Sequence, residues 1–249
     1  MRYSRPTLGI LWAFLSPLFV VTIFYVVFSI ILQVKTKEAP FFLYLMSAVF
    51  SWRFFQDSLV SSATSLIDNK NLIRESSFPH YLIPLAIVVA NAINFLPSLS
   101  ILIVASLISL KGLPIFILFL PVVLFIHFII ITGLSLMLSI FYVKWRDTRY
   151  ILEAALTILF YLTPAFYSIY LVKGSFSKVL FNIYISNPLV GILNLYRLST
   201  LRGFYQAIKE DIGLLNLVII PVVFSFIIFW LGFYLYKKNK NSINDHISY

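Results

Sequence analysis

Six long apolar stretches dominate this sequence, and they limit the fold more than any other feature. A helix that crosses the hydrocarbon core of a bilayer needs about 20 mostly apolar residues. With 61% hydrophobic and 11% charged residues and a mean hydropathy of +0.96, the chain is also too apolar for a soluble globular protein. We therefore predict an all-α membrane protein with six transmembrane helices, at Leu11–Val34, Phe41–Leu59, Tyr81–Leu110, Pro114–Val143, Ile151–Leu171 and Leu214–Tyr236.

The apolar stretches leave no segment long enough for a separate soluble domain. We therefore expect one transmembrane domain over residues 1–249. The first stretch is too long for a signal-peptide core and lacks a small-residue cleavage site after it, so it is expected to be a retained helix. The chain has no cysteine, which excludes disulfides, thiolate metal sites and cysteine nucleophiles.

The Lys and Arg residues of the connecting segments predict the orientation. A cytoplasmic N-terminus places ten basic residues inside, against Lys35, Lys37 and Lys111 in the short outer connections. We therefore expect both termini in the cytoplasm. The formal net charge of +10 fits attraction to anionic inner-leaflet lipids, and the sequence shows no features of a nucleic-acid partner. The ten inner residues are Arg2, Arg5, Lys70, Arg74, Lys144, Arg146, Arg149, Lys237, Lys238 and Lys240.

A polar segment, Ser65–Pro79, separates the second and third stretches. At helical spacing it carries an apolar stripe with Leu66 and Ile73, a polar and acidic stripe, and a basic stripe. Such a segment can lie against a membrane and offer both charge signs to a protein partner. An ordinary solvated loop is the alternative. The candidate contact residues are Leu66, Asp68, Lys70, Asn71, Ile73, Arg74, Glu75 and Phe78.

The long outer connection, Val172–Gly213, contains two helical segments too short to span a bilayer, Phe176–Ile185 and Pro188–Leu201. Asn187 and Pro188 are expected to break the chain between them. We predict a re-entrant pair of half-helices that dips into the outer leaflet and forms an outer gate, because irregular backbone at membrane depth must be buried or line a cavity. Two helices lying flat on the outer surface are the alternative.

Charged residues in or beside the stretches are candidate site residues. Arg53 and Asp57 lie at i, i+4 and can pair, which offsets part of a burial cost on the order of 2.5–3.5 kcal/mol for one charge. They either line a substrate path or form a structural pair. Arg146, Asp147 and Arg149 form a predicted cytoplasmic turn with a gating or docking role, or serve as plain positive-inside anchors.

Aromatic residues make up 18% of the chain and suggest a class of substrate. Sugar rings have apolar C–H faces that stack on aromatic rings, so an aromatic surface can pass a glycan without gripping one linkage. Helix packing and an interfacial belt are the alternative. The candidate channel-lining residues are Trp52, Arg53, Phe54, Phe55, Asp57, Phe160, Tyr161, Phe166, Tyr167 and Tyr170.

Four segments together resemble a known family. They are RYSRPTLGILWAFLSPL at Arg2–Leu18, SWRFFQDSLVSSATSLIDNKNLIRESSFPHYLIPLA at Ser51–Ala86, RDTRYILEAALTILFYLTPAFYS at Arg146–Ser168 and NPLVGILNLYR at Asn187–Arg197. In this order the chain resembles, over essentially its whole length, the type-2 ABC exporter permeases. These permeases move polysaccharides such as O-antigen, capsule and teichoic-acid chains across the bacterial plasma membrane.

The resemblance implies a role for each segment and a set of partners. The segment matching Leu66–Pro79 would be the cytoplasmic coupling helix that docks on an ATPase subunit, and residues 172–213 would form the re-entrant helices near the outer exit. Two permeases would work with two ATPases on a lipid-linked polysaccharide. The chain has no G-x-x-x-x-G-K-[ST] loop. ATP and Mg would therefore bind to the ATPase, with no cofactor in this non-enzymatic chain.

Other classes of protein remain as alternatives. A drug or lipid exporter permease is the nearest alternative within the same family. A polytopic membrane glycosyl or phosphate transferase would need Asp, His or Arg clustered in one loop, but the nine acidic residues are scattered. An ion-coupled carrier would need midplane carboxylates, of which Asp57 alone is a candidate.

Overall fold

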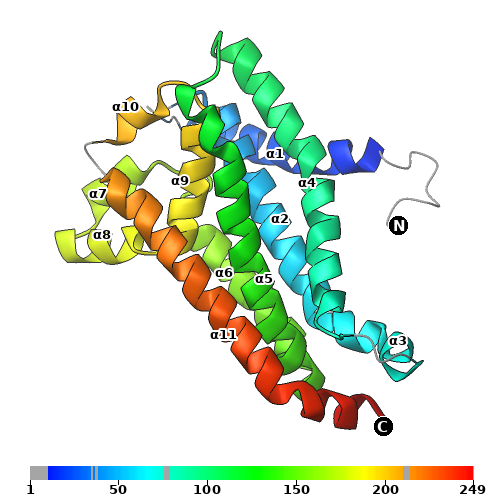
Figure 1. The fold of residues 1–249 in the computed structure, drawn as a ribbon. Helices are drawn as coiled ribbons and strands as arrows, with labels where there is room; N and C mark the ends of the chain where they lie inside the picture. The colour runs from blue at the N-terminus through cyan, green and yellow to red at the C-terminus, as the bar shows by residue number, and fades with distance from the viewer. Residues whose placement is uncertain (1–10, 35, 37–38, 76–78, 210–212, 249) are drawn as a thin grey trace. The chain divides into compact units, whose positions relative to one another are not determined.

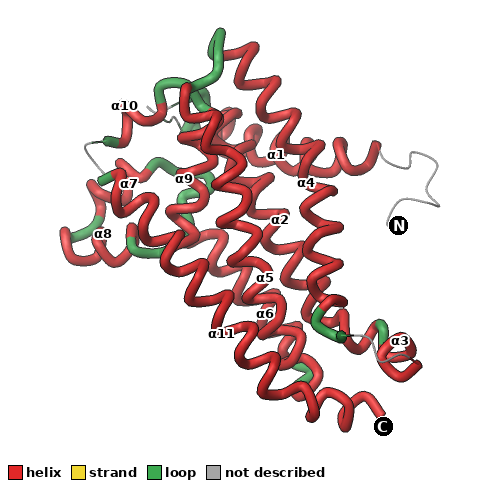
Figure 2. Tube along the Cα trace, viewed as in Figure 1, coloured by secondary structure: helices red, strands yellow, loops and turns green. Residues whose placement is uncertain are grey.

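The computed structural model of the chain describes residues 11–34, 36, 39–75, 79–209 and 213–248. Every regular element in these ranges is a helix, and no strand occurs in them (Figure 2). The predicted all-α class is therefore confirmed for the described residues. In chain order the elements are α1 (Leu11–Tyr25), η1 (Val26–Ile31), α2 (Phe41–Asp68), α3 (Lys70–Glu75), α4 (Leu82–Ser109), η2 (Ile115–Phe119), α5 (Leu120–Lys144), α6 (Thr148–Leu162), α7 (Ile169–Ser175), α8 (Lys178–Ile185), α9 (Pro188–Thr200), α10 (Phe204–Ile208) and α11 (Leu214–Ser248) (Figure 1).

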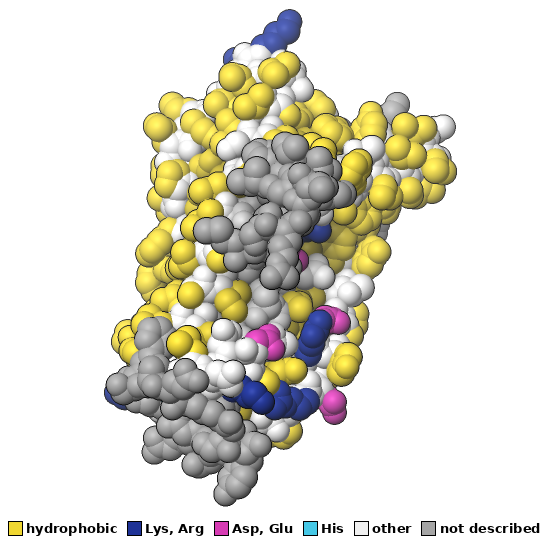
Figure 3. Space-filling model, turned by 90° about the vertical axis from the view of Figure 1, so that its right-hand side faces the viewer, with side chains coloured by type: hydrophobic (Ala, Val, Ile, Leu, Met, Phe, Trp, Pro, Cys, Tyr) yellow, Lys and Arg dark blue, Asp and Glu magenta, His cyan; other side chains and the backbone are white. Residues whose placement is uncertain are grey.

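Among the described residues, three helices are long and apolar enough to cross a membrane: α4, α5 together with the 3-10 helix η2, and α11. The bent pair α8 and α9, at an angle of 72°, makes a fourth crossing if the pair is one broken span. Hydrophobic side chains cover most of the described surface on the face drawn in Figure 3. These features support a multi-pass membrane protein.

Three of the predicted helices differ from the structure. The sixth runs past Tyr236 to Ser248 as α11. The second runs past Leu59 to Asp68 as α2, so the polar segment begins inside that helix. The prediction of one helix at Ile151–Leu171 is wrong, because α6 ends at Leu162 and α7 begins at Ile169. Pro164 lies in the gap, and proline both lacks an N–H and disfavours the α conformation of the residue before it.

Parts of the sequence-based predictions fall outside the described residues. The motif at Arg2–Leu18 is described only from Leu11. The basic residues Arg2, Arg5, Lys35 and Lys37, on which the predicted orientation partly rests, are also outside. The same holds for residues 210–212 of the outer connection.

The chain groups into two compact units. Among the described residues, unit 1 comprises those within the ranges 1–53, 94–123 and 163–221, and unit 2 comprises those within 54–93, 124–162 and 222–249. The boundaries fall inside α2, α4, α5 and α11 and at the end of α6. They do not fall in exposed linkers, where boundaries between separate domains usually lie.

Unit 1 is built around the first half of α2 and around α9. All residues of α9 from Leu189 to Thr200 are buried. A Cβ at Gly191 would lie 2.4 Å from Pro221 Cγ, so α9 and the start of α11 pack at close range. In this unit the α2 residues from Leu43 to Phe50 are also buried. These two helices therefore form the interior of unit 1.

Unit 2 is built around the second half of α2, with α5 and α11. Ser62 Oγ of α2 donates a hydrogen bond to Ser135 Oγ of α5 at 2.7 Å. A Cβ at Gly232 would lie 2.2 Å from Gly133 O, so the α5 and α11 backbones approach more closely than any larger side chain allows. Small and hydroxyl-bearing residues thus bring these helices together, as is common between membrane helices.

Candidate functional site

The polar segment that begins in α2 has a buried and an exposed face. Leu66 and Ile73 are buried, and they pack in unit 2 against apolar residues of α4, α5 and α11. Asp68, Lys70 and Asn71 are exposed. The structure therefore gives the predicted apolar stripe a core to pack on and leaves polar side chains available to a partner.

The remaining predicted contact residues are placed less fully. Asp68 Oδ2 accepts a hydrogen bond from Thr64 Oγ1 at 2.6 Å, which orients this exposed carboxylate. Arg74 and Glu75 lie in the last turn of α3. Phe78 lies outside the described residues. Docking on an ATPase stays a prediction for all of them.

The corner between α5 and α6 carries the second charged group. Arg149 Nε and Glu153 Oε1 form an exposed i, i+4 ion pair at 3.0 Å, and this hydrogen bond raises the pKa of Arg149. The Arg146 guanidinium carbon lies 5.3 Å from the ring centroid of Tyr142, and Asp147 is exposed. Exposed ion pairs contribute little to stability. The charged side chains of this corner are therefore accessible at the protein surface and contribute little to the stability of the fold.

Arg53 and Asp57 of α2 are both half-buried. Arg53 Nη1 donates a hydrogen bond to Ser16 Oγ of α1 at 3.1 Å, within unit 1. The backbone carbonyl of Asp57 accepts a hydrogen bond from Ser61 Oγ, within unit 2. The ion pair between Arg53 and Asp57 stays a prediction.

The three aromatic residues predicted beside Arg53 are buried. Trp52, Phe54 and Phe55 are only 3–5% exposed. In unit 2, the rings of Phe54 and Phe55 pack against His127 of α5 at centroid distances of 5.2 and 5.9 Å. In this structure these side chains therefore offer little surface to a sugar ring.

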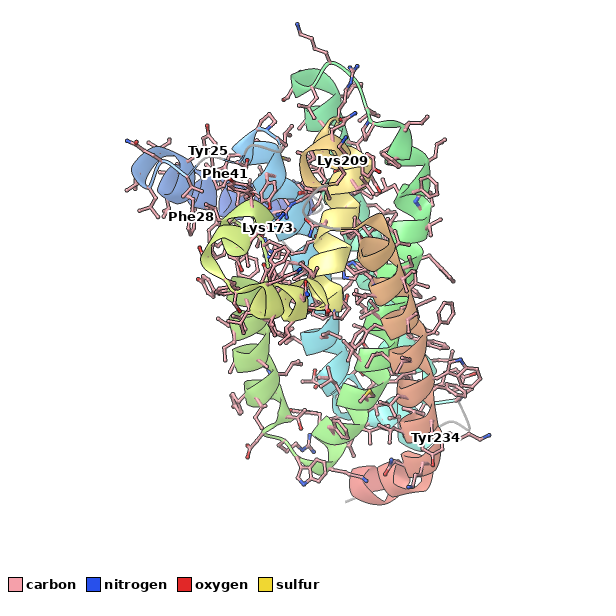
Figure 4. The ribbon with its side chains drawn as sticks, turned by 90° about the vertical axis from the view of Figure 1, so that its left-hand side faces the viewer. Tyr25, Phe28, Phe41, Lys173, Lys209 and Tyr234 are labelled. Atoms are coloured by element: carbon pink, nitrogen blue, oxygen red, sulfur yellow. The ribbon has the colours of Figure 1, made fainter. Side chains whose placement is uncertain are left out.

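The aromatic run after the middle of α6 divides into packed and exposed rings. Tyr161 and Tyr170 are 54% and 51% exposed. Phe166 is half-buried and stacks on Phe28 of η1, labelled in Figure 4, with ring centroids 4.7 Å apart. Phe160 lies edge-on to Tyr161 at 5.6 Å. The exposed Tyr161 and Tyr170 remain the candidates for contact with a substrate.

Tyr167 takes part in a hydrogen-bonded cluster in unit 1. Its backbone carbonyl accepts from the Tyr44 hydroxyl at 2.9 Å, and its own hydroxyl accepts from the Tyr184 hydroxyl at 3.3 Å. These bonds tie the segment between α6 and α7 to α2 and α8. In this structure Tyr167 therefore connects three segments of unit 1 by hydrogen bonds.

The predicted break at Asn187 and Pro188 is present. Asn187 caps α9, because its Oδ1 accepts from the Leu189 N–H at 3.0 Å, and Pro188 occupies the first helical position. Both residue types are preferred at these places. The break holds α8 and α9 at 72° to each other. A gating role for Asn187 and Pro188 stays a prediction.

Arg197 is the functional candidate that sequence reasoning missed. It is fully buried in unit 1, and its guanidinium carbon lies 3.4 Å from the centroid of the Tyr44 ring. Its Nη2 donates to Pro164 O at 2.6 Å and to Ala165 O at 3.1 Å, and its Nη1 donates to Asn194 Oδ1 at 3.3 Å.

These contacts supply hydrogen-bond donors to backbone carbonyls of the break between α6 and α7. The chain between α6 and α7 is irregular, so its carbonyls lack the N–H partners that a continuous helix would supply. Arg197 supplies donors from α9 and stacks on α2 at the same time. One side chain therefore links α9, α2 and the α6–α7 break. Arg197 is the only charged residue of α9, whose other residues are apolar or uncharged. This isolated charge is the signal in the sequence that could have identified it.

No three His, Asp or Glu side chains in the described part of the chain are grouped so that they could hold a metal ion. The absence of a cofactor stays a prediction for the protein.

Comparison with known proteins gives one family and several relatives. The family model described as ABC-2 type transporter matches residues 1–201. The chain is 24% identical over 247 residues to the O-antigen export system permease protein RfbA of Myxococcus xanthus, covering 99% of this chain and 90% of that protein. Two proteins of the same name from Klebsiella pneumoniae are 26% and 25% identical over 249 and 234 residues, covering 96% and 90% of this chain and 88% and 86% of those proteins.

Proposed function

Because this chain belongs to the ABC-2 type transporter family, we propose that it is the membrane permease subunit of an ATP-driven exporter of lipid-linked polysaccharide. The observation that carries the proposal is the extent of similarity to proteins named O-antigen export permeases, which covers 90–99% of this chain. The polysaccharide would pass from the cytoplasm to the outer side of the bacterial plasma membrane. The chain would act as a transport subunit, with ATP and Mg bound by a separate ATPase.

The proposed topology has six crossings with both termini in the cytoplasm. Three crossings are α4, η2 with α5, and α11, whose apolar length supports them directly. The other three are α1 with η1, α2, and α6 with the segment that follows it. The helices α8 and α9 form the outer re-entrant pair in this proposal, and their 72° bend supports it.

The proposed ATPase contact is the exposed face of α3 and the end of α2. Leu66 and Ile73 anchor this face on the core of unit 2, while Asp68, Lys70 and Asn71 are exposed. An anchored helix transmits force better than a loose loop, because a push on it moves the helices on which it packs. The Arg146–Arg149 corner is a second cytoplasmic contact in the same proposal.

The working unit is proposed to contain two copies of the permease and two ATPases. The substrate path is then proposed to lie at the contact between the two permeases. Tyr161 in unit 2 and Tyr170 in unit 1 each have an exposed ring and are each proposed to contact the substrate. Buried rings such as Phe54 and Phe55 would join the path only after rearrangement.

A strain that lacks this gene tests the proposed cargo. Surface polysaccharide should disappear and lipid-linked chains should accumulate inside the cell, and a plasmid copy of the gene should restore export. Normal surface polysaccharide together with increased drug sensitivity or altered outer-leaflet lipid would assign a drug or lipid as the cargo.

A matched pair of variants tests the docking face. Lys70→Glu combined with Asn71→Ala should lower co-purification of the ATPase and lower export at normal membrane abundance. Lys237→Glu changes an exposed charge on α11 and serves as the control. Equal co-purification of the ATPase with both variants would remove α3 from the docking site.

A further inference from the structure

A cavity of about 300 Å³ lies in unit 1 and has no part in the functions described so far. Three segments meet around it: the connection from α4 into η2, the end of α9, and the turn that leads into α10 (Figure 1). In the proposed topology all three lie on the outer side of the membrane. Its volume is at the lower end of the range for small-molecule sites.

Two aromatic rings form part of its wall. The ring centroids of Phe116 and Tyr205 are 5.4 Å apart at an interplanar angle of 60°. The buried side chains of Leu198 and Leu201 close the cavity from the α9 side. This part of the cavity is apolar and suits the C–H face of a sugar ring, which packs well on aromatic surfaces.

Arg202 provides a positively charged group at the same cavity, and backbone geometry holds it there. Arg202 Nη1 donates to Lys111 O at 3.1 Å. Lys111 and Gly112 have φ values of +52° and +147°, which turn this carbonyl at the end of α4. A Cβ at residue 112 would lie 3.0 Å from Arg202 Nη1, so glycine leaves room for the guanidinium.

The chemistry of the lining selects for an anion. Arginine has five N–H donors in a planar fork, and the bond to Lys111 uses one of them. Gln206 adds a side-chain amide, and among the residues that the structure describes no Asp or Glu lines the cavity. Lys209, three residues after Gln206 and labelled in Figure 4, is exposed, and the acidic residues Glu210 and Asp211 that follow it lie outside the described residues.

We propose that this cavity binds a sugar unit that carries a carboxylate or a phosphate, as part of the exported chain on the outer side of the membrane. The inference rests on the proposed function for the identity of the chain that supplies the sugar. The ring would pack on Phe116 and Tyr205, and the acidic group would accept hydrogen bonds from Arg202. Such a site would hold an emerging chain briefly and oppose its return.

An anionic lipid headgroup is the competing ligand. Ile115, Leu118 and Phe119 beside the cavity are 79%, 77% and 57% exposed, as residues in contact with lipid are. The acyl chains of a lipid would pack on these exposed residues, however, and its phosphate would need only the cation, whereas the wall formed by Phe116 and Tyr205 suits the face of a sugar ring. The observations therefore favour a ligand with both a ring and an acidic group.

Binding to the purified permease–ATPase complex in nanodiscs of neutral phosphatidylcholine tests the proposal. The probes are cellobiouronic acid and cellobiose, which differ by one carboxylate in place of a hydroxymethyl group. Saturation-transfer NMR detects weak binding and shows which ring protons lie against the protein. The wild-type complex should bind the acidic disaccharide more tightly than the neutral one.

Three variants separate the two parts of the site. Arg202→Gln should lower affinity for cellobiouronic acid about tenfold, the loss expected for a hydrogen bond to a charged group, and should leave cellobiose unchanged. Tyr205→Leu should weaken both probes and reduce transfer to the ring protons. Lys237→Gln on α11 is the control and should change neither. Each variant complex must retain ATPase in equal amount, which confirms that it is folded.

Two results would overturn the proposal. In the first, Arg202→Gln and Tyr205→Leu bind both probes as the wild type does. In the second, the wild-type complex no longer binds the acidic disaccharide when the nanodiscs contain phosphatidylglycerol, and this competition by the lipid requires Arg202. That result assigns the cavity to a lipid headgroup. Neither result depends on export in cells, so the proposed export function can stand if this site fails.

Discussion

Replacement of Arg197 by Met should destabilise the protein because it removes a donor that the break between α6 and α7 needs. Methionine keeps a long apolar stem but leaves Pro164 O and Ala165 O without the bonds at 2.6 and 3.1 Å. Each buried carbonyl left without a donor costs about 1–3 kcal/mol. Loss of the cation over the Tyr44 ring costs about 2 kcal/mol when the site is desolvated.

One effect opposes this loss. Removing a buried charge relieves a desolvation penalty of several kcal/mol. The net destabilisation should therefore be about 2–4 kcal/mol. For a chain of this size, each kcal/mol shifts the melting temperature by about 2–4 °C, which gives a shift of about 4–16 °C.

Arg197→Lys distinguishes a requirement for the fork from a requirement for charge. Lysine keeps the buried charge, so the desolvation penalty remains. Its ammonium group is not planar, however, and cannot donate to two carbonyls while it also stacks on the Tyr44 ring, as the guanidinium does. We expect Arg197→Lys to be destabilised at least as much as Arg197→Met.

The assay is thermal unfolding of purified protein in one detergent, followed by the fluorescence of its tryptophans. Lys209→Met, at an exposed position of the same unit, is the control and should shift the melting temperature by less than about 2 °C. A melting temperature of Arg197→Met equal to that of the control would refute the reasoning. A wild-type value for Arg197→Lys would show that only the charge matters.

Two further predictions concern helix packing and the outer break. Gly232→Ala places a Cβ 2.2 Å from Gly133 O and should cost about 1–3 kcal/mol, whereas Gly174→Ala, with nothing within 4 Å, should not destabilise. Melting temperatures report both, and equal values would show that α5 and α11 separate at little cost. Asn187→Ala should lower stability by about 1 kcal/mol through loss of the α9 cap. Asn187→Ser, which can still cap, should recover most of that loss in the same assay, and an unchanged Asn187→Ala would exclude the cap as a source of stability.

The sequence predicted those features whose causes are local. Apolar length and composition predicted the all-helical class. The Asn187-Pro188 pair predicted the start of α9, because the cap and the first-turn proline act within three residues. Helical periodicity predicted that Leu66 and Ile73 share one apolar stripe, and the structure shows that this stripe packs on the core of unit 2.

The features that the sequence did not predict depend on distant residues. Ile151–Leu171 is mostly apolar, with Glu153 near its start, so its composition favoured one helix although Pro164 breaks it. The importance of Arg197 was not visible, because it hydrogen-bonds to the backbones of Tyr44 and Pro164, which lie 153 and 33 residues away. Similarly, only the structure shows that the rings of Phe54 and Phe55 pack against His127.

The placement of α2 connects the proposed docking face to the proposed path. This helix carries Arg53 and Asp57 and so is too polar to face lipid. Its first half packs on α9 residues in unit 1 through Tyr44 and Arg197, and its second half packs on α5 in unit 2 through Ser62. The C-terminal end of α2 carries part of the exposed polar face that is proposed to dock on the ATPase. Force applied by an ATPase at that end would therefore act first on the helix that forms part of the interior of both units.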